Sequence, residues 1–398
     1  MPEITIQELS VANTLKIAIP FSDYAFRPSP QAVRKVDTAT YKPLAEARRT
    51  FALYADDAPQ AVAGLIPMQI NVRGHIFSMG GVGAVTTAPE ARRKGYARAL
   101  MQHILATCYE SGSPVSTLYP FRESFYQRLG YVGFPQIHDV QFDPTALGEL
   151  LRTPPNGTVR RMALADGLTI YMDYLHDILA QTHGFGLLPQ SFYAYRAAQK
   201  PLWLAIAEAH GQVQGVMAYS ISGHGGTLHA PIFLYRQMHG RMLLLHYLAQ
   251  HIDQITRARL SHLSPGDLPE LWWHDLDARI VSPRERDGFL TPMGRVISVA
   301  DLDGLPVGPG AFRATILDEQ CPWNNGSYAF EASGGRLQVQ PTRHADVELH
   351  IQGLSALVFT GLDPAELYWR GWGDPHWQLQ DTLRSMFPRA LPFLFSEF

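Results

Sequence analysis

The stretch Val85–Leu105, VTTAPEARRKGYARALMQHIL, decides the fold of the first part of the chain. An apolar run ends before Pro89, and from Ala97 on apolar residues recur at helical spacing. The sequence predicts that the first turn of this helix contains Arg92, Arg93, Lys94 and Gly95. A helix N-terminus carries positive partial charge and favours acidic residues, so three cations there conflict with it. We therefore expect an anionic ligand at this helix start.

The spacing of three residues in this stretch is typical of a pyrophosphate-binding loop. Arg92, Gly95 and Ala97 fit the pattern of Arg or Gln, two residues, Gly, one residue, and Gly or Ala. Backbone N–H groups at a helix start bind a pyrophosphate through hydrogen bonds and the helix dipole, and glycine allows close approach. A basic, solvated helix start is the alternative. The position directly after an apolar strand favours the phosphate loop.

Composition limits the partners of the chain. Its 398 residues predict two or three domains, and 46% hydrophobic with 17% charged residues is typical of a globular protein. The formal net charge of −3 gives no overall attraction to nucleic acid or to an acidic membrane. We expect neither partner, so an anion site must be local.

Cysteine usage and the first residues predict a cytoplasmic protein. Cys108 and Cys321 lie far apart and have no metal-ligand spacing, so neither a disulfide framework nor a metal site is expected. The start, MPEITIQELS, lacks the features of a signal peptide. No apolar run approaches the roughly 20 residues that a membrane span needs.

Alternating and continuous apolar runs predict a mixed α/β fold around the opening stretch. Gly64 is interpreted as a bulge in the second of these strands. A short helix is expected near Ser124–Leu129. The predicted strands are Thr50–Asp56, Ala61–Val72, Met79–Thr87, Val115–Leu118 and one that begins near Tyr131.

The rest of the chain divides into two further regions. A linker is predicted at Arg152–Thr158. After it, the sequence predicts a hairpin with Gly215 in its second strand and a helix near Met242–Ile255, which partly repeat the first pattern. An internal repeat and a coincidence both remain open as explanations. A third region begins near Gly294 with a strand and a helix, and a further helix is expected over Leu354–Trp372. The chain ends in a helix and an apolar tail that we expect to insert into the protein.

These features resemble the GNAT family of acetyl-CoA-dependent N-acetyltransferases. In that family the strand equivalent to Val85–Thr87 hydrogen-bonds the pantetheine arm, and the loop equivalent to Arg93–Arg98 holds the pyrophosphate. The resemblance implies acetyl-CoA as co-substrate and no metal. The residues expected to bind the cofactor are Val85, Thr86, Thr87, Arg92, Arg93, Lys94, Gly95, Tyr96, Ala97, Arg98, Phe121 and Arg122.

A narrower resemblance covers FRESFYQRLGYVGF, Phe121–Phe134, together with the end SEF. Both are similar to the enhanced intracellular survival (Eis-like) group, whose layout implies tandem GNAT folds and a C-terminal sterol-carrier-like domain. The boundaries expected from it are an active GNAT domain at 1–150, a GNAT-like domain without the cofactor motif at 151–290, and the sterol-carrier-like domain at 291–398. The group also implies a homo-oligomer, a hexamer.

The resemblance implies direct acetyl transfer from the thioester to an amine, with two groups that move protons. Tyr126, in the family pattern Tyr-x-Arg-x-Gly-Tyr, would protonate the coenzyme A sulfur, a step uphill by about 2 kcal/mol for a phenol and a thiol of ordinary pKa. The carboxylate of Phe398 would act as the base. Asp23 and Glu397 fall where acids would bind a cationic amine. Phe121 and Arg122, after Pro120, depart from the family pattern and would narrow the pocket.

Each assignment has an ordinary structural alternative. Tyr126 could be a core residue, Phe398 a docking residue, and Asp23 and Glu397 solvated surface residues. The expected function is N-acetylation of a primary amine on a polyamine, an aminoglycoside-like molecule or a lysine. A non-catalytic acetyl-CoA sensor and a lipid-binding protein remain the alternatives.

Overall fold

The computed structural model describes residues 3–26, 38–282 and 291–398. The chain packs as two compact units, each formed by more than one segment. Unit 1 contains Met1–Phe134, His183–Phe192 and Pro292–Phe398, and unit 2 contains Pro135–Thr182 and Tyr193–Thr291. The chain therefore changes unit at Phe134, while Arg152–Thr158 lies inside unit 2. The boundaries near 150 and 290 stay predictions.

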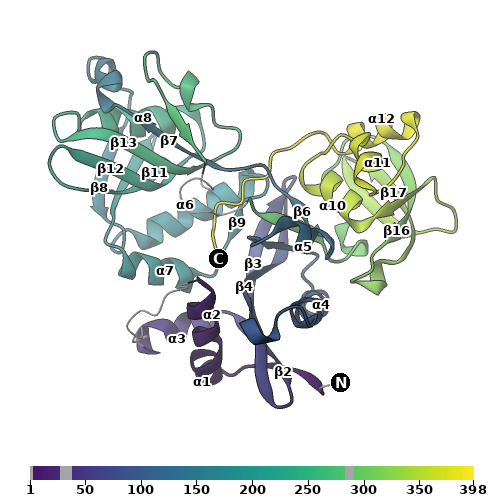
Figure 1. The fold of residues 1–398 in the computed structure, drawn as a ribbon. Coiled ribbons are helices and arrows are strands. Elements are labelled where there is room, and N and C mark those ends of the chain that lie inside the picture. The colour runs from purple at the N-terminus through teal and green to yellow at the C-terminus, as the bar shows by residue number, and fades with distance from the viewer. Residues whose placement is uncertain (1–2, 27–37, 283–290) are drawn as a thin grey trace. The chain divides into compact units, whose positions relative to one another are not determined.

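The first sheet of unit 1 is mixed, and its centre is built by consecutive strands (Figure 1). β2, β3 and β4 pair antiparallel, and β4 pairs parallel to β5 after helix α4. In order across the sheet the strands are β1 (Ile4–Glu8), β2 (Arg49–Ala55), β3 (Ala58–Val72), β4 (His75–Thr87), β5 (Val115–Leu118), β15 (Met293–Val296) and β6 (Val132–Gly133), and β9 (Gly186–Leu187) also pairs with β3.

Helix α4 (Tyr96–Glu110) covers this sheet with the apolar face that the sequence predicts. Its buried side chains pack with those of the central strands into one core. Cys108 and Cys321 both belong to this core as free thiols, and burial raises the pKa of each to about 12. Within the described residues before 134, the other helical segments are α1 (Val11–Asn13), a π-helical turn (Thr14–Ala18), α2 (Ile19–Phe26), α3 (Thr38–Glu46), a 3₁₀ turn (Pro89–Ala91) and α5 (Glu123–Gln127).

Unit 2 repeats the central connection of the first sheet. β10, β11 and β12 pair antiparallel, and β12 pairs parallel to β13 after helix α8 (Met238–Ala249). This shared topology favours an internal repeat over coincidence. In order the strands are β14 (Arg279–Val281), β7 (His138–Phe142), β13 (Ile255–Leu263), β12 (Gly226–Tyr235), β11 (Gln212–Ile221), β10 (Trp203–Ala209) and β8 (Thr158–Ala163), with helix α6 (Leu168–Gln181) between β8 and β9 and α7 (Gln190–Gln199) after β9.

The last part of unit 1 carries a four-stranded sheet and three helices. The sheet order is β18 (Arg336–Pro341), β17 (Gly326–Ser333), β16 (Ala311–Leu317) and β19 (Val347–His350). The helices are α10 (Ile351–Phe359), α11 (Glu366–Arg370) and α12 (Trp377–Met386).

Two sequence predictions in this part are wrong in detail. The single helix expected over Leu354–Trp372 is two helices, because Gly361 takes a φ of +57° and Pro364 cannot continue a helix. The strand near Gly294 exists, but it pairs with β5 and β6 of the first sheet and is followed by a 3₁₀ turn, not by an α-helix.

Two arginines join this last part to the first sheet. Arg295 of β15 lies fully buried beside Asp318, with 2.5 Å between Nη2 and Oδ2, and its other nitrogens donate to main-chain carbonyls. Arg73, in the turn between β3 and β4, donates to the carbonyls of Leu357 and Val358 at 3.0 and 2.8 Å. Arg73 therefore caps the C-terminal end of α10, where a cation is favoured by the helix dipole.

Candidate active site

Strand β4 continues beyond the residues that pair with its parallel neighbour, β5. Its pairing with β5 runs from Met79 to Val82, whereas its pairing with β3 continues to Thr87. The residues after Val82 therefore have a paired edge toward β3 and an open edge toward β5. Val85–Thr87, expected to bind the pantetheine arm, lie on this part of the strand.

A bulge lies in β4 at the point where the strands separate. Gly83 pairs with Gly64 and Thr86 with Val62, so that Ala84 and Val85 oppose the single residue Ala63. Ala84 has a φ of +53°, which is strained for a residue with a side chain. The sequence prediction placed the bulge at Gly64 of the neighbouring strand. The extra residue is in β4, and such bulges re-aim backbone groups beside active sites.

The basic loop, Arg92–Gly95, precedes helix α4 and does not form its first turn as predicted. The helix begins at Tyr96, with Gly95 as N-cap at a φ of +85°. A left-handed residue at this position breaks the helical path, so the three cations lie exposed in a turn. Tyr96 is buried in the core, and Arg98 stands in the first turn. The first N–H groups of a helix have no partner within it and face such a loop.

Tyr126 lies on α5 with 2% of its surface exposed. Its ring meets Phe121, Phe125 and Tyr131 edge to face, with centroids 5.6, 5.0 and 6.1 Å away. Burial raises the pKa of Tyr126 above the usual range of a tyrosine. The phenol is therefore neutral at physiological pH, and its proton is harder to give up than an ordinary pKa implies. Phe121 and Arg122 are exposed.

The apolar tail, Phe387–Phe398, belongs to unit 1 and runs beside β9 (Figure 1). Its residues Phe393, Leu394 and Phe395 are buried, so the tail inserts as expected. The Tyr119 hydroxyl, just after β5, donates to the carbonyl of Leu394 at 3.0 Å, and the rings of Tyr119 and Phe398 are 5.6 Å apart. A Cβ built on Gly83 would lie 3.3 Å from the main-chain carbonyl carbon of Phe398. The end of the tail thus touches β4 directly before the bulge.

Asp23 and Glu397, the two acids predicted to bind the amine, are less closely tied to the contact between Phe398 and β4. Asp23 lies half-buried on α2, a helix that packs on β4, and Glu397 is half-buried in the tail. The structure thus brings together Phe398 and the bulged part of β4, and separately Phe121 and Tyr126.

Sequence reasoning missed Gly83, Tyr119 and the segment His183–Leu187. The glycines of β4 were the available signal, since glycine inside a strand marks close approach of another chain segment. A side chain at Gly81 would meet the ring of Phe398 at 3.1 Å.

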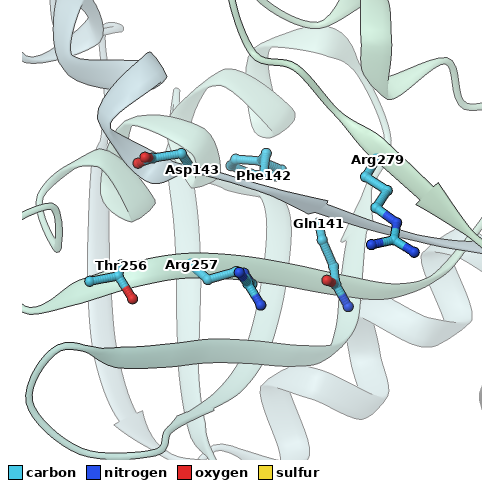
Figure 2. Close-up of a pocket in the computed structure, with 6 residues that line it drawn as sticks. All are labelled: Gln141, Phe142, Asp143, Thr256, Arg257 and Arg279. Atoms are coloured by element: carbon cyan, nitrogen blue, oxygen red, sulfur yellow. The ribbon is translucent and has the colours of Figure 1, made fainter.

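A cavity of about 280 Å³ lies elsewhere, in unit 2 (Figure 2). It opens between β7, β13 and β14, and none of the predicted site residues lines it. The lining residues are Gln141, Phe142, Asp143, Thr256, Arg257 and Arg279.

Two further properties concern the described ranges only. Within them, no helix combines the length and apolar character needed to span a bilayer. Among the same residues, no three histidine, cysteine or acidic side chains gather as metal ligands would.

Comparison with known families agrees with this geometry. Residues 9–133 match the acetyltransferase (GNAT) domain, and residues 305–394 match the sterol carrier protein domain. The chain is a GNAT N-acetyltransferase with a C-terminal sterol carrier protein domain. The bulged strand and the basic loop both fall within the GNAT match. The predicted fold class, a mixed α/β protein with tandem GNAT-like folds and this C-terminal domain, is confirmed.

Relatives of this N-acetyltransferase share its length and layout. A Streptomyces avermitilis protein named as an uncharacterized N-acetyltransferase is 25% identical over 357 residues, which cover 82% of this chain and 83% of the relative. A solved Enterococcus faecalis structure, a probable N-acyltransferase, superposes with a TM-score of 0.85 at 20% identity over 100% of both chains. Eis1 from Mycobacterium abscessus gives 0.76 at 15% identity, over 99% of this chain and 100% of its own. At these identities the solved structures establish the fold alone.

Proposed function

We propose that this N-acetyltransferase transfers the acetyl group of acetyl-CoA to a primary amine by direct attack, and that it belongs to the Eis-like group. The observation that supports this most strongly is the contact of Phe398 with Gly83, directly before the bulge of β4. It brings the proposed base to the strand that is proposed to hold the acetyl donor.

The donor would be held by Val85–Thr87 and the basic loop. The open edge of β4 offers backbone N–H and C=O groups to the pantetheine arm. The exposed cations of the loop and the first N–H groups of α4 suit a pyrophosphate, which carries negative charge. The backbone groups orient the donor, and the cations add affinity. Phe121 and Arg122, exposed beside Tyr126, complete the proposed cofactor contacts.

Two groups would move protons in the transfer. The neutral amine attacks the thioester carbonyl, and the carboxylate of Phe398 takes the proton that the nitrogen loses. The Tyr126 phenol gives its proton to the departing thiolate of coenzyme A. The Tyr126 phenol carries its proton at neutral pH and can act as the acid, although its raised pKa makes the transfer to the thiolate more uphill than for an ordinary tyrosine.

The proposed acceptor is a cationic amine of the polyamine, aminoglycoside or lysine type. Asp23 and Glu397 are the acids proposed to attract it. Assembly into a homo-oligomer, a hexamer as in the group it resembles, is part of the same proposal. Light scattering on the purified protein measures the oligomer.

The test follows free thiol while the enzyme turns over acetyl-CoA with these amine classes. Three chains are compared: the full chain, one lacking Phe398, and one extended by a single glycine after Phe398. The extension keeps the aromatic ring but moves the carboxylate by one residue, so it separates charge from packing.

We expect both altered chains to bind acetyl-CoA normally and to lose about 10²- to 10⁴-fold in kcat, the usual contribution of a general base. Undiminished turnover in the extended chain would rule out this carboxylate as the base. Binding of acetyl-CoA without thiol release for any amine would indicate a sensor instead of an enzyme.

A further inference from the structure

We propose that His183–Leu187, called here the clamp segment, positions Phe398 at strand β4 by holding the tail. The inference rests on the proposed function, in which the carboxylate of Phe398 is the base. The segment contains β9 and belongs to unit 1, although α6 before it lies in unit 2 and α7 after it ends in unit 2. Its residues would act through Phe398 and would not touch the substrate.

The clamp segment and the tail fit together closely along their backbones. The Phe393 N–H donates to the carbonyl of His183 at 2.9 Å. Gly184 has a φ of +79°, and a Cβ there would lie 2.5 Å from the Phe393 nitrogen and from the Pro392 Cα. Only glycine leaves room for the tail at this point.

Side chains extend the contact toward the end of the tail. The rings of Phe185 and Phe395 stack with centroids 5.6 Å apart and an angle of 8° between their planes. A Cβ on Gly186 would lie 2.7 Å from the Leu394 Cδ1. Phe185 and Leu394 are both fully buried, so these contacts are shielded from solvent.

The clamp segment is itself fixed to the hairpin that carries the bulge. Asn71 of β3 donates its N–H to the Phe185 carbonyl at 3.1 Å and accepts from the Gly184 N–H at 2.7 Å. The Arg73 N–H donates to Nδ1 of His183 at 3.0 Å. Nε2 of the same ring must then carry the proton, and it donates to the Phe359 carbonyl at 2.6 Å.

Contacts with other segments must fix the position of the tail, because the tail has no regular secondary structure of its own after α12. The clamp segment fixes it at Phe393, and the Tyr119 hydroxyl fixes it at Leu394. The ring of Phe185 holds the tail at Phe395, so only Ser396 and Glu397 lie between this point and Phe398 at β4. A displacement of about 1 Å at a reacting group can cost about a hundredfold in rate.

Gly184→Ala is the sharpest perturbation, because the added methyl meets tail backbone and no reacting group. Gly211→Ala is the matched control: Gly211 has a φ of +73° in the turn between β10 and β11, and a Cβ there meets nothing within 4 Å. Both variants strain the backbone in the same way, but only one displaces the tail. Phe185→Leu is a milder second variant that removes the stacking on Phe395.

The first readout is hydrogen exchange at the Phe393 amide in the free protein, which needs no substrate. We expect Gly184→Ala to speed this exchange at least about tenfold and Gly211→Ala to leave it unchanged. Equal exchange in the two variants would overturn the clamp, whatever the activity of the enzyme is.

The second readout is the pH profile of amine-dependent thiol release. We expect Gly184→Ala and, less strongly, Phe185→Leu to lower kcat while acetyl-CoA affinity stays the same. The deficit should shrink at high pH, where the free amine is deprotonated without a base. A lower melting temperature with an unchanged pH profile would show a merely structural role and would refute positioning.

The chain lacking Phe398 separates the two proposals. If it loses activity while Gly184→Ala behaves as Gly211→Ala does, the base stands and the clamp is wrong. If it keeps full activity, the base is wrong and the clamp has no catalytic role.

Discussion

Protonation of His183 should destabilise unit 1 as the pH falls below neutrality. Burial lowers the pKa of His183 from 6.5 to about 4, and the neighbouring Arg73 cation acts in the same direction. The folded state therefore favours the neutral ring, which accepts a hydrogen bond from the Arg73 N–H and donates one to the Phe359 carbonyl. An imidazolium ring has no acceptor for the first of these bonds.

The sign and size of the effect follow from linkage. Between pH 4 and pH 6.5 the unfolded chain binds the proton more tightly than the folded chain does, so the free energy of unfolding rises with pH. The contribution is complete above about pH 6.5 and is lost as the pH falls toward 4. At 1.36 kcal/mol per pKa unit, the shift corresponds to about 3 kcal/mol.

Urea unfolding followed by circular dichroism from pH 4 to pH 8 measures this contribution. The quantity of interest is the difference between the full chain and His183→Gln, because titrations that the two proteins share cancel in it. We expect this difference to narrow by about 3 kcal/mol over the range. His344→Gln, at an exposed position, controls for the loss of one ionisable group. A difference that stays constant with pH would refute the reasoning.

Three other substitutions test the core, the acid and the basic loop. Arg295→Met should lower the free energy of unfolding by about 3 to 5 kcal/mol in urea titrations, because it leaves Asp318 buried without its cation; a loss below about 1 kcal/mol would contradict this. Tyr126→Phe should lower kcat by about 10²- to 10⁴-fold and leave the dissociation constant of acetyl-CoA unchanged, and an unaltered kcat would exclude it as the acid. Lys94→Ala should weaken acetyl-CoA binding about two- to fivefold at low salt, as befits an exposed cation, with kcat at saturation unchanged. Calorimetry at several ionic strengths measures this, and the exposed Arg152→Ala, in unit 2, should show no such change.

The parts of the site that are local in sequence could be predicted from it. The helical spacing from Ala97 onward predicts a helix with one buried face, and the structure has α4 at this position. The apolar run before Pro89 predicts a buried strand, and the structure has β4 there. The start of the helix was misplaced because periodicity marks the buried face and not the turn before it. The left-handed Gly95 ends the loop, so the cations stand outside the helix.

The contacts that bring the tail to β4 join residues far apart in sequence, and no spacing encodes them. The apolar composition of Phe393–Phe398 predicted insertion but not a partner. The partners are Gly83 and the clamp segment, whose glycines leave room for another chain. The strand β15 was assigned to the third region for the same reason, since a four-residue strand carries no signal of the sheet it joins.

The second fold keeps the framework of the first but packs aromatic side chains on the strand after the bulge. In β12, Ala230 and Pro231 oppose the single residue Tyr219, the same bulge that Ala84 and Val85 form in β4. β12 also runs past its last pair with β13, as β4 runs past its last pair with β5.

After the bulge, however, the rings of Phe233 and Tyr235 pack on Trp272, with centroids 5.7 and 6.3 Å away. The guanidinium of Arg241, in the first turn of α8, lies over two of these rings, those of Tyr235 and Trp272. The cation at this helix start thus lies against aromatic rings of the protein, whereas the cations before α4 stay exposed. Two folds with one topology therefore differ in what covers the strand after the bulge, and that difference leaves the first as the better candidate for the acetyl donor.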